Sequence, residues 1–478
     1  RTGGLRKMID PVRPHYYFAR VFARFALLPL LLFAGVAFPL SAATYCVATT
    51  GDDTNPGSPA APWRTIQKAA DSLGPGDTAL VRGGVYTEAV TVHVSGSAAG
   101  GWVTFKNYPG ETPIVDGAAL QVPSGDTGLF LIVDRSYVAI EGFEIRNYQA
   151  NSDSRVPAGV FITGGAHDLA LVSNRVHDIV NTNKNGNAFG VAVYGSSAGR
   201  PISNLVARGN EVFNLQTGNS ESFTLNGNVI NFEISGNSVH DNNNIGIVFI
   251  GFEGTCPDPA RDRARDGVCR SNVVCNISDS RNPSYKPGDN SADGIYCDGC
   301  SNVLIELNEV HHSDIGVELA SEHANGTADH VTLRDNFIWS NRTEGVSIGG
   351  YDAKRGRTLN CAIISNTLYH NDTLRGGSGE LYIQYHTASN TITHNTLAAN
   401  SQNLLIDSPF PGSDNLVDWN LYTAPGGSNR AQWVWQGKTH TGFAAWRAGT
   451  TNDAHSTVAD PASAAARAIF DRRGSPPP

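Results

Sequence analysis

The sequence predicts an all-β chain wound into a right-handed parallel β-helix, a solenoid of stacked coils. The first observation behind this fold class is a repeated phrase: Asn, any residue, an apolar residue, then a polar or aromatic one. Its copies are Asn174–His177, Asn210–Phe213, Asn237–His240, Asn308–His311, Asn336–Trp339, Asn366–Tyr369 and Asn395–Ala398, with looser ones at Asn272 and Asn420. They follow one another at roughly 25–36 residues, a spacing typical of stacked repeats.

The second observation is a short strand, usually led by Gly, that keeps step with the Asn phrase. Alternating apolar residues over four or five positions indicate a strand. The copies are Gly159–Ile162, Gly190–Val193, Gly246–Phe249, Gly294–Cys297, Gly316–Leu319, Gly345–Ile348 and Glu380–Ile383. No unit can bury its apolar side alone, so the units must stack. An inward Asn in each coil can then hydrogen-bond to those above and below. A β-propeller or a sandwich is the alternative, but propeller blades are longer and have a Trp–Asp signature.

Residues 1–43 are interpreted as a secretory signal peptide. Residues 1–24 are basic, residues 25–40 are almost wholly apolar, and Ser41-Ala42-Ala43 supplies small residues for cleavage. The apolar run is short for a membrane span. We therefore expect a secreted protein, extracellular or periplasmic and monomeric, whose mature chain has no membrane span.

The mature chain divides into three parts. Residues 44–117 are expected to be an N-terminal cap with the first coils, including a short helix over Trp63–Ala70 and a strand over Thr78–Arg82. Such a cap is needed because an uncovered coil exposes a strand edge. Residues 118–424 should form the β-helix, with an insertion at 252–292, and residues 425–478 a C-terminal cover and tail.

The charge of the chain argues against nucleic acid as a partner. The net charge is −9, and residues 1–43 hold six basic residues but one acidic residue, so the mature chain is more acidic still. Strongly acidic proteins bind nucleic acids poorly without local basic patches. A polyanionic substrate would likewise need local basic residues or a bound cation.

The chain has seven Cys, and export favours disulfides. Cys256, Cys269 and Cys275 flank the insertion and are expected to staple it. Cys297 and Cys300 have the spacing of half a zinc site, but no second half with suitable spacing is evident. The odd number leaves at least one thiol unpaired or paired between chains.

The register of the Gly-led strands predicts which residues point outward, because side chains alternate along a strand. The expected outward stripe consists of Val248, Ile250, Tyr296, Asp298, Glu318, Ala320, Ser347, Gly349, Tyr382 and Gln384. Just past the strands follow Glu253, Glu322, His323, Asp352, Lys354 and His386. The functional site is therefore expected between Phe252 and His386.

A family resemblance rests on two phrases of this region. Ser291–Gly294, followed by Ser313–Glu318, resembles the calcium-binding signature of family-nine pectate lyases. The resemblance implies Ca²⁺ as cofactor, and the metal ligands that it implies are Asp293, Asp314 and Glu318. Oxygen ligands of this kind suit Ca²⁺.

The resemblance is partial. Ile315 replaces one family carboxylate, and Ser347 stands where the family has its Lys base. A more general resemblance, to the pectate-lyase-like β-helix superfamily, covers most of the chain. That superfamily also holds glycoside hydrolases, epimerases and non-enzymatic adhesins.

The favoured hypothesis is a Ca²⁺-assisted lyase that cleaves an extracellular, acidic, uronate-containing polysaccharide by β-elimination. A base removes the proton beside the uronate carboxylate, and a cation neutralises that carboxylate. Lys354 or His323 is the candidate base, and Arg342 or Arg355 the candidate partner of the carboxylate. The competing interpretation of Lys354 is a solvated turn residue.

Two other functions remain open. A glycoside hydrolase needs two carboxylates about 5–10 Å apart, and Asp298 and Glu318 on adjacent coils suit that role. A non-catalytic glycan-binding protein would use the same stripe. Residues assigned to substrate binding are Tyr296, Glu322, Asp352, Arg355, Tyr382, Gln384 and His386. The histidines that recur beside the Asn phrase are interpreted as structural: His177, His240, His311 and His370.

Overall fold

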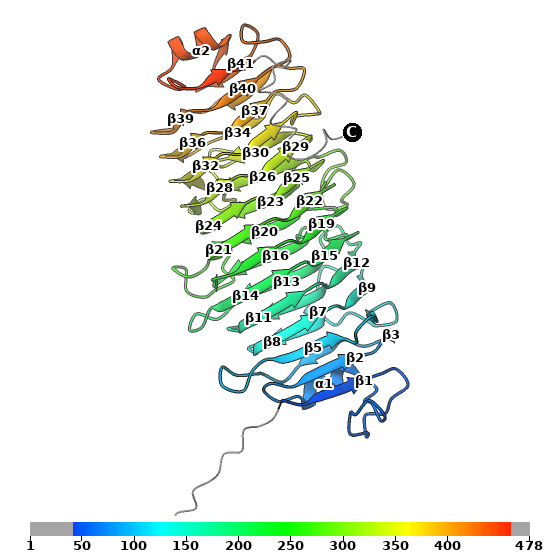
Figure 1. Ribbon diagram of the computed structural model, residues 1–478. Coiled ribbons are helices and arrows are strands. Elements are labelled where there is room, and N and C mark those ends of the chain that lie inside the picture. Colours follow the sequence, from blue (N-terminus) through cyan, green and yellow to red (C-terminus); the bar gives the residue numbers. More distant parts are fainter. Residues whose placement is uncertain (1–41, 460–478) are drawn as a thin grey trace, which may run out of the picture. The chain divides into compact units, whose positions relative to one another are not determined.

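The computed structural model describes residues 42–459, which wind into successive coils of three parallel sheets (Figure 1). Strands of neighbouring coils pair in parallel throughout the described chain, apart from the terminal antiparallel pair β41–β42 and a few isolated bridges in turns. The predicted parallel β-helix is confirmed, and the propeller and sandwich alternatives are excluded.

Sheet 1 has one strand from almost every coil and carries the Gly-led phrases. Its strands are β4 (Val90–Val92), β7 (Gly125–Val133), β10 (Arg155–Thr163), β13 (Phe189–Gly195), β16 (Phe223–Gly227), β20 (Ile247–Ile250), β23 (Asp293–Asp298), β26 (Ile315–Ala320), β30 (Glu344–Ile348), β34 (Leu381–Ile383), β38 (Leu404–Ser408), β41 (Gln432–Trp435) and β42 (Lys438–Thr441).

Sheet 2 follows sheet 1 along each coil. Its strands are β1 (Thr44–Val47), β2 (Thr78–Val81), β5 (Val103–Asn107), β8 (Ser136–Glu141), β11 (His167–Val172), β14 (Ile202–Arg208), β17 (Val229–Ile230), β18 (Glu233–Ser235), β21 (Arg265–Arg270), β24 (Ser301–Glu306), β27 (Thr327–Asp329), β28 (Thr332–Arg334), β31 (Arg357–Leu359), β32 (Ala362–Ile364), β35 (Thr387–Ala388), β36 (Thr391–Thr393) and β39 (Leu416–Asp418).

Sheet 3 carries the Asn phrases. Its strands are β3 (Gly84–Tyr86), β6 (Pro113–Asp116), β9 (Glu144–Ala150), β12 (Arg175–Asn181), β15 (Glu211–Phe213), β19 (Ser238–His240), β22 (Val273–Cys275), β25 (Glu309–His311), β29 (Phe337–Trp339), β33 (Thr367–Tyr369), β37 (Thr396–Ala398), β40 (Leu421–Thr423) and β43 (Thr457–Val458).

The main core fills the space between the three sheets. Ile247 and Phe249 of β20 belong to this core, whereas Val248 between them lies in a separate cluster with Tyr296. The predicted alternation of inward and outward side chains along sheet 1 is therefore confirmed.

A buried ladder of Asn side chains joins the coils where sheet 2 turns into sheet 3. Asn308 shows the pattern: its amide nitrogen donates to Cys269 O and to Asn336 Oδ1, both at 3.0 Å. Its own Oδ1 accepts the backbone and side-chain N–H groups of Asn272, both at 2.9 Å. The ladder contains Asn174, Asn210, Asn237, Asn272, Asn308, Asn336, Asn366, Asn395 and Asn420. Each rung satisfies the backbone groups of a corner that would otherwise be buried without partners.

Short helices close both ends of the described coils (Figure 1). Helix α1 (Ile66–Ser72) starts after Thr65, whose side chain accepts a hydrogen bond from Lys68 N. The predicted helix over 63–70 is thus shifted by this N-cap. Helix α2 (Phe443–Gly449) was not predicted, and its buried Trp446 packs against Trp433 at the last coil.

The expanded coil between Phe249 and Asp293 consists of two long turns, 251–264 and 276–292, separated by β21 and β22. The prediction that Cys256, Cys269 and Cys275 staple it is wrong, because all three are free. Cys269 lies in the main core, whereas Cys275 is on sheet 3. The disulfide joins Cys297 and Cys300 instead.

The predicted signal peptide lies almost wholly outside the described residues, as does the end of the predicted tail. No helix among residues 42–459 is long and apolar enough to cross a membrane.

We expect Asn308→Ala to lower the free energy of unfolding by about 3 kcal/mol. The reason is that the substitution leaves Cys269 O and the N–H groups of Asn272 buried without partners, at about 1–3 kcal/mol for each unsatisfied group. Denaturant unfolding would measure the change. Asn219→Ala, at an exposed position outside the ladder, is the control. Equal stability of the two variants would contradict this role of the ladder.

Candidate active site

The outward face of sheet 1 presents three columns of side chains that run across the coils. The first column is Asp293, Ile315 and Glu344. The middle column is Val248, Tyr296, Glu318, Ser347, Tyr382 and Asp407. The third column pairs Asp298 with Ala320. The register thus places five of the predicted site residues, Asp293, Tyr296, Asp298, Glu318 and Tyr382, on one surface.

The chemistry of this face changes along the coils. The early coils present an apolar cluster that includes Phe161 and Phe189. From β23 onward the face becomes acidic, with Asp293, Asp298 and Glu318 all at most 7% exposed. Buried carboxyl groups are uncommon unless they are paired or protonated, so this half of the face is the candidate site.

The carboxyl group of Glu318 lies at the centre of the acidic columns. Its Oε1 accepts hydrogen bonds from Ser347 Oγ at 3.2 Å and from Gln384 Nε2 at 3.3 Å. Gln384 also donates to Ser347 Oγ at 2.6 Å. Ser347, which occupies the position of the family's Lys, therefore orients Glu318 together with Gln384.

Burial and mutual repulsion raise the pKa values of several of these carboxyl groups. Burial, with the charges of Glu344 and Glu322, raises the pKa of Glu318 to about 8. Burial likewise raises the pKa of Glu344 to about 7. Burial and the charge of Glu322 raise the pKa of Asp298 well above its ordinary value. A protonated carboxyl group near neutral pH is what a general acid requires.

Asp298 is positioned by contacts from three coils. Its Oδ1 accepts a hydrogen bond from the backbone N–H of Glu322 at 2.8 Å, one coil further on. The disulfide between Cys297 and Cys300 encloses Asp298 and Gly299. Gly251 of the long turn donates its N–H to Asp298 O at 2.8 Å.

Arg263 holds the long turn 251–264 against this strand end. Its guanidinium donates to Cys300 O at 2.9 Å and to Thr327 O at 2.7 Å, and it pairs with Asp329. The same group lies 5.1 Å from the ring centre of Phe252. One side chain thus joins the turn to the next two coils. It fastens the insertion, which is what disulfides among Cys256, Cys269 and Cys275 were expected to do.

The three predicted calcium ligands occupy different environments. Asp293 Oδ1 is buried and has no hydrogen-bond partner within the described residues. Asp314 has no exposed surface, and its carboxylate accepts from Arg342 Nη1 at 2.8 Å and from Asp279 N at 3.0 Å. Among residues 42–459 no group of three or more His, Cys, Asp or Glu side chains could hold a metal ion. The set as arranged here does not fit Ca²⁺, because Asp314 is occupied by Arg342, and calcium binding stays a prediction.

The predicted basic residues lie beside the face, in turns. Lys354 is exposed, and its backbone N–H donates to Asp352 Oδ1 at 2.7 Å. Arg355 lies 4.6 Å from the ring centre of Tyr351 and donates to Glu322 O at 3.0 Å. The Lys354 side chain is thus exposed in its turn, whereas the Arg355 side chain is held by two contacts.

The remaining predicted residues differ in burial. Tyr382 is half-buried in the middle column, where burial, followed by the charge of Asp407, raises its pKa to about 12. His323 is half-buried in the turn after β26. His386 is exposed, and its Nε2 lies 3.0 Å from Ala353 O. Tyr382 thus belongs to the middle column, whereas His323 and His386 lie in turns beside it.

The sequence prediction missed Glu344 and Glu221. Glu344 precedes the Gly of its strand, as Asp293 does, so an alignment that included the residue before Gly would have found it. Glu221 precedes β16, and burial together with the charge of Glu253 raises its pKa to about 8. Glu380 stands where other copies have Gly, but it points inward and accepts hydrogen bonds from Asn371.

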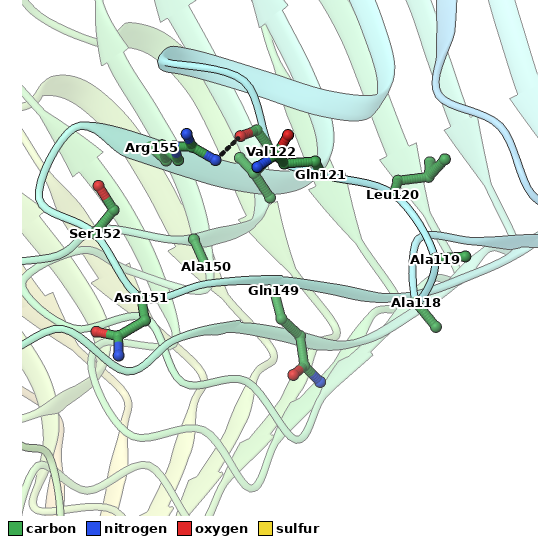
Figure 2. A pocket seen from close by; sticks show the side chains of 10 residues that line it. All are labelled: Ala118, Ala119, Leu120, Gln121, Val122, Gln149, Ala150, Asn151, Ser152 and Arg155. Atoms are coloured by element: carbon green, nitrogen blue, oxygen red, sulfur yellow. Dashed lines mark hydrogen bonds between the residues drawn. The ribbon is translucent and has the colours of Figure 1, made fainter.

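A pocket of about 610 Å³ is formed by residues of earlier coils than those of the acidic columns, and Figure 2 shows its lining. It is lined by Ala118–Val122, Gln149–Ser152 and Arg155, and Arg155 Nη1 donates to Val122 O at 3.1 Å. Arg155 is its one ionisable side chain. The lining offers no acid–base pair, so we do not assign catalysis to it.

Comparison with known proteins identifies two family matches. A family model described as "Pel9A-like, right handed beta helix region" matches residues 45–191. A second, described as "Right handed beta helix region", matches residues 265–438. The first match covers the cap and early coils, and the second covers the acidic half of sheet 1.

Two relatives and one solved structure resemble the chain. The uncharacterized protein YwoF of Bacillus subtilis is 37% identical over 416 residues, 87% of each chain. Pectate lyase PEL9 of Emericella nidulans is 28% identical over 190 residues, which are 37% of this chain and 42% of the lyase. The GH136 lacto-N-biosidase of Eubacterium ramulus has a TM-score of 0.48 at 15% identity, with 80% of this chain and 64% of the biosidase covered.

The raised pKa values predict how stability depends on pH. A carboxyl group with a folded-state pKa above its unfolded value stabilises the fold fully below the unfolded pKa, about 4.3 for Glu, and loses that contribution as pH rises through the folded pKa. For Glu318 and Glu344 the loss extends to about pH 8 and about pH 7. We expect the unfolding temperature to fall between these limits, and to fall less steeply in Glu344→Gln.

The matched control is Glu141→Gln, on sheet 2 beside Lys106. Scanning calorimetry at closely spaced pH values would measure how steeply the unfolding temperature changes with pH. The same slope in Glu344→Gln, Glu141→Gln and the wild type would contradict a shared, buried acidic cluster.

Proposed function

The chain belongs to the pectate-lyase-like right-handed β-helix superfamily, and we propose that it is a carbohydrate-active enzyme that cleaves an extracellular polysaccharide on the outward face of sheet 1. The support is the concentration of buried, mutually interacting carboxyl groups on one face of an otherwise regular scaffold. Perturbed pKa values of this kind gather at catalytic sites.

The geometry best supports hydrolysis of a glycosidic bond. The observation that carries this proposal is the pairing of Glu318, whose pKa is raised to about 8, with Asp298 on the preceding coil. Their backbone positions are one coil and two residues apart, about 8 Å from a strand spacing of about 4.8 Å and a rise of about 3.3 Å per residue. Both mechanisms of glycoside hydrolysis use carboxyl pairs separated by about 5–10 Å.

In this proposal Glu318 is the general acid and protonates the oxygen of the leaving sugar. Asp298 is its partner and must act in the ionised form: burial and the charge of Glu322 raise its pKa well above the ordinary value, and the hydrogen bond from Glu322 N opposes that shift. The Asp298 carboxylate accepts a proton from a water molecule that attacks the anomeric carbon. The glycosidic C–O bond breaks, and the Glu318 proton leaves on the departing sugar. The products are two shorter chains, one with a new reducing end.

β-Elimination is the second candidate, supported by the Pel9A-like match over residues 45–191 and by the likeness to a pectate lyase. In that reaction Lys354 or His323 would be the base, with Arg342 or Arg355 near the uronate carboxylate. As arranged here, Asp293, Asp314 and Glu318 do not fit Ca²⁺, because Arg342 already pairs with Asp314. We also propose that the protein is secreted, from the sequence of residues 1–43.

We expect Glu318→Gln to abolish cleavage, because an amide cannot donate the proton that the leaving oxygen needs. Reducing ends released from a polysaccharide panel would measure hydrolysis, and ultraviolet absorbance of an unsaturated uronate would measure β-elimination. Glu141→Gln should retain wild-type activity. An unsaturated product in the wild type, lost on treatment with a chelator, would show the lyase reaction instead.

The pH dependence of the rate has a defined direction. Since Glu318 acts in its protonated form, kcat should fall as pH rises through about 8. Glu344→Gln removes the neighbouring charge with the largest effect on Glu318, so the fall of kcat should move to lower pH. If kcat falls at the same pH in Glu344→Gln as in the wild type, a group other than Glu318 causes that fall.

A further inference from the structure

We propose that the outward face of sheet 1 takes an uncharged glycan and disfavours a polyuronate. This inference rests on the proposed function, since it concerns the same face. It departs from the acidic substrate expected from the sequence, and it follows from the arrangement of charged groups around the columns.

The face is surrounded by carboxyl groups from consecutive coils. Glu253 is exposed in the long turn after β20, and its Oε2 accepts from Asn226 Nδ2 at 2.5 Å. Glu322 is exposed after β26. The acidic residues that border or occupy the face are Glu221, Glu253, Asp293, Asp298, Glu318, Glu322, Glu344 and Asp407. A uronate bound there would lie among acidic side chains on both sides, and its negative charge would oppose their ionisation.

The two arginines beside the face, Arg342 and Arg355, already have acidic or backbone partners. Arg342 pairs with Asp314 at 2.8 Å, on the side where the strands begin. Arg355 lies 3.7 Å from Asp352 and donates to Glu322 O. The three columns as defined above contain no Lys or Arg. Nothing in their described residues therefore offers the bidentate partner that a bound carboxylate prefers.

The polar groups of the face suit hydroxyl groups better than anions. Ser347 and Gln384 already share hydrogen bonds with Glu318, so they present both donors and acceptors. Tyr382 adds a half-buried phenol. A neutral carboxyl group also donates one hydrogen bond and accepts others. Sugar hydroxyl groups, which donate and accept, can satisfy such a set without adding charge.

A uronate would be penalised twice. It would lose hydration on entering a partly buried surface, and its charge would disfavour ionisation of Asp298 and Glu322. We therefore expect binding of the charged polymer to be weaker by about tenfold or more at low ionic strength.

The experiment compares polymers that differ in charge but share a backbone. The probes are polygalacturonate and its methyl ester, alginate and its propylene glycol ester, and carboxymethyl- and hydroxyethyl-cellulose. Affinity electrophoresis at low salt with a chelator present measures binding, using the wild type and Glu318→Gln. The uncharged member of at least one pair should bind about tenfold more tightly, and added salt should narrow the difference.

Variants at the exposed rim test the charge directly. Glu253→Gln and Glu322→Gln should each reduce the preference for the uncharged polymer, while Glu141→Gln should not. Tighter binding of the charged member, or no binding of any uncharged polymer, would overturn the proposal. Because binding is read separately from turnover, activity retained by Glu318→Gln would defeat the catalytic assignment while leaving the charge preference measurable.

Discussion

The outward face of sheet 1 depends on the register of the parallel coils, and the buried Asn ladder is the interaction that repeats with that register. Each rung ties one corner to the coils before and after it, as Asn308 does with Asn272 and Asn336. The coils can therefore vary elsewhere, in turns as different as 251–264 and the short turns of later coils. A regular corner and variable turns together give a scaffold on which one face can become acidic.

That same register creates the electrostatics of the site. Residues at equal positions in adjacent coils lie about 4.8 Å apart, so acidic residues on neighbouring coils are close enough to disfavour one another's ionisation. Glu318, between Tyr296 and Ser347, is raised to a pKa of about 8 by this arrangement. Burial supplies the largest part of the shift and the neighbouring carboxylates supply the rest. Stacking therefore turns an ordinary Glu into a candidate proton donor.

The sequence predicted the fold and the middle column, because alternation and the Gly-led phrases are local signals that survive in the chain. The sequence could not show which of the two predicted calcium ligands, Asp293 or Asp314, has a free carboxylate oxygen. Both are acidic residues at the start of a strand, next to Gly or Ile. One has a carboxylate oxygen without a hydrogen-bond partner, and the other is neutralised by Arg342 from the next coil. Arg263 was missed for the same reason: its partners Cys300 and Asp329 are distant in sequence. Contacts between coils carry no local signature.

The most direct test of the central claim is a crystal structure of Glu318→Gln with a bound oligosaccharide from an uncharged polymer that the protein binds. The account predicts sugar rings across the columns of sheet 1, with one glycosidic oxygen within hydrogen-bond distance of residue 318 and the anomeric carbon facing Asp298. Sugar bound on sheet 2, on sheet 3 or in the pocket beside Arg155, with the acidic columns free, would contradict it.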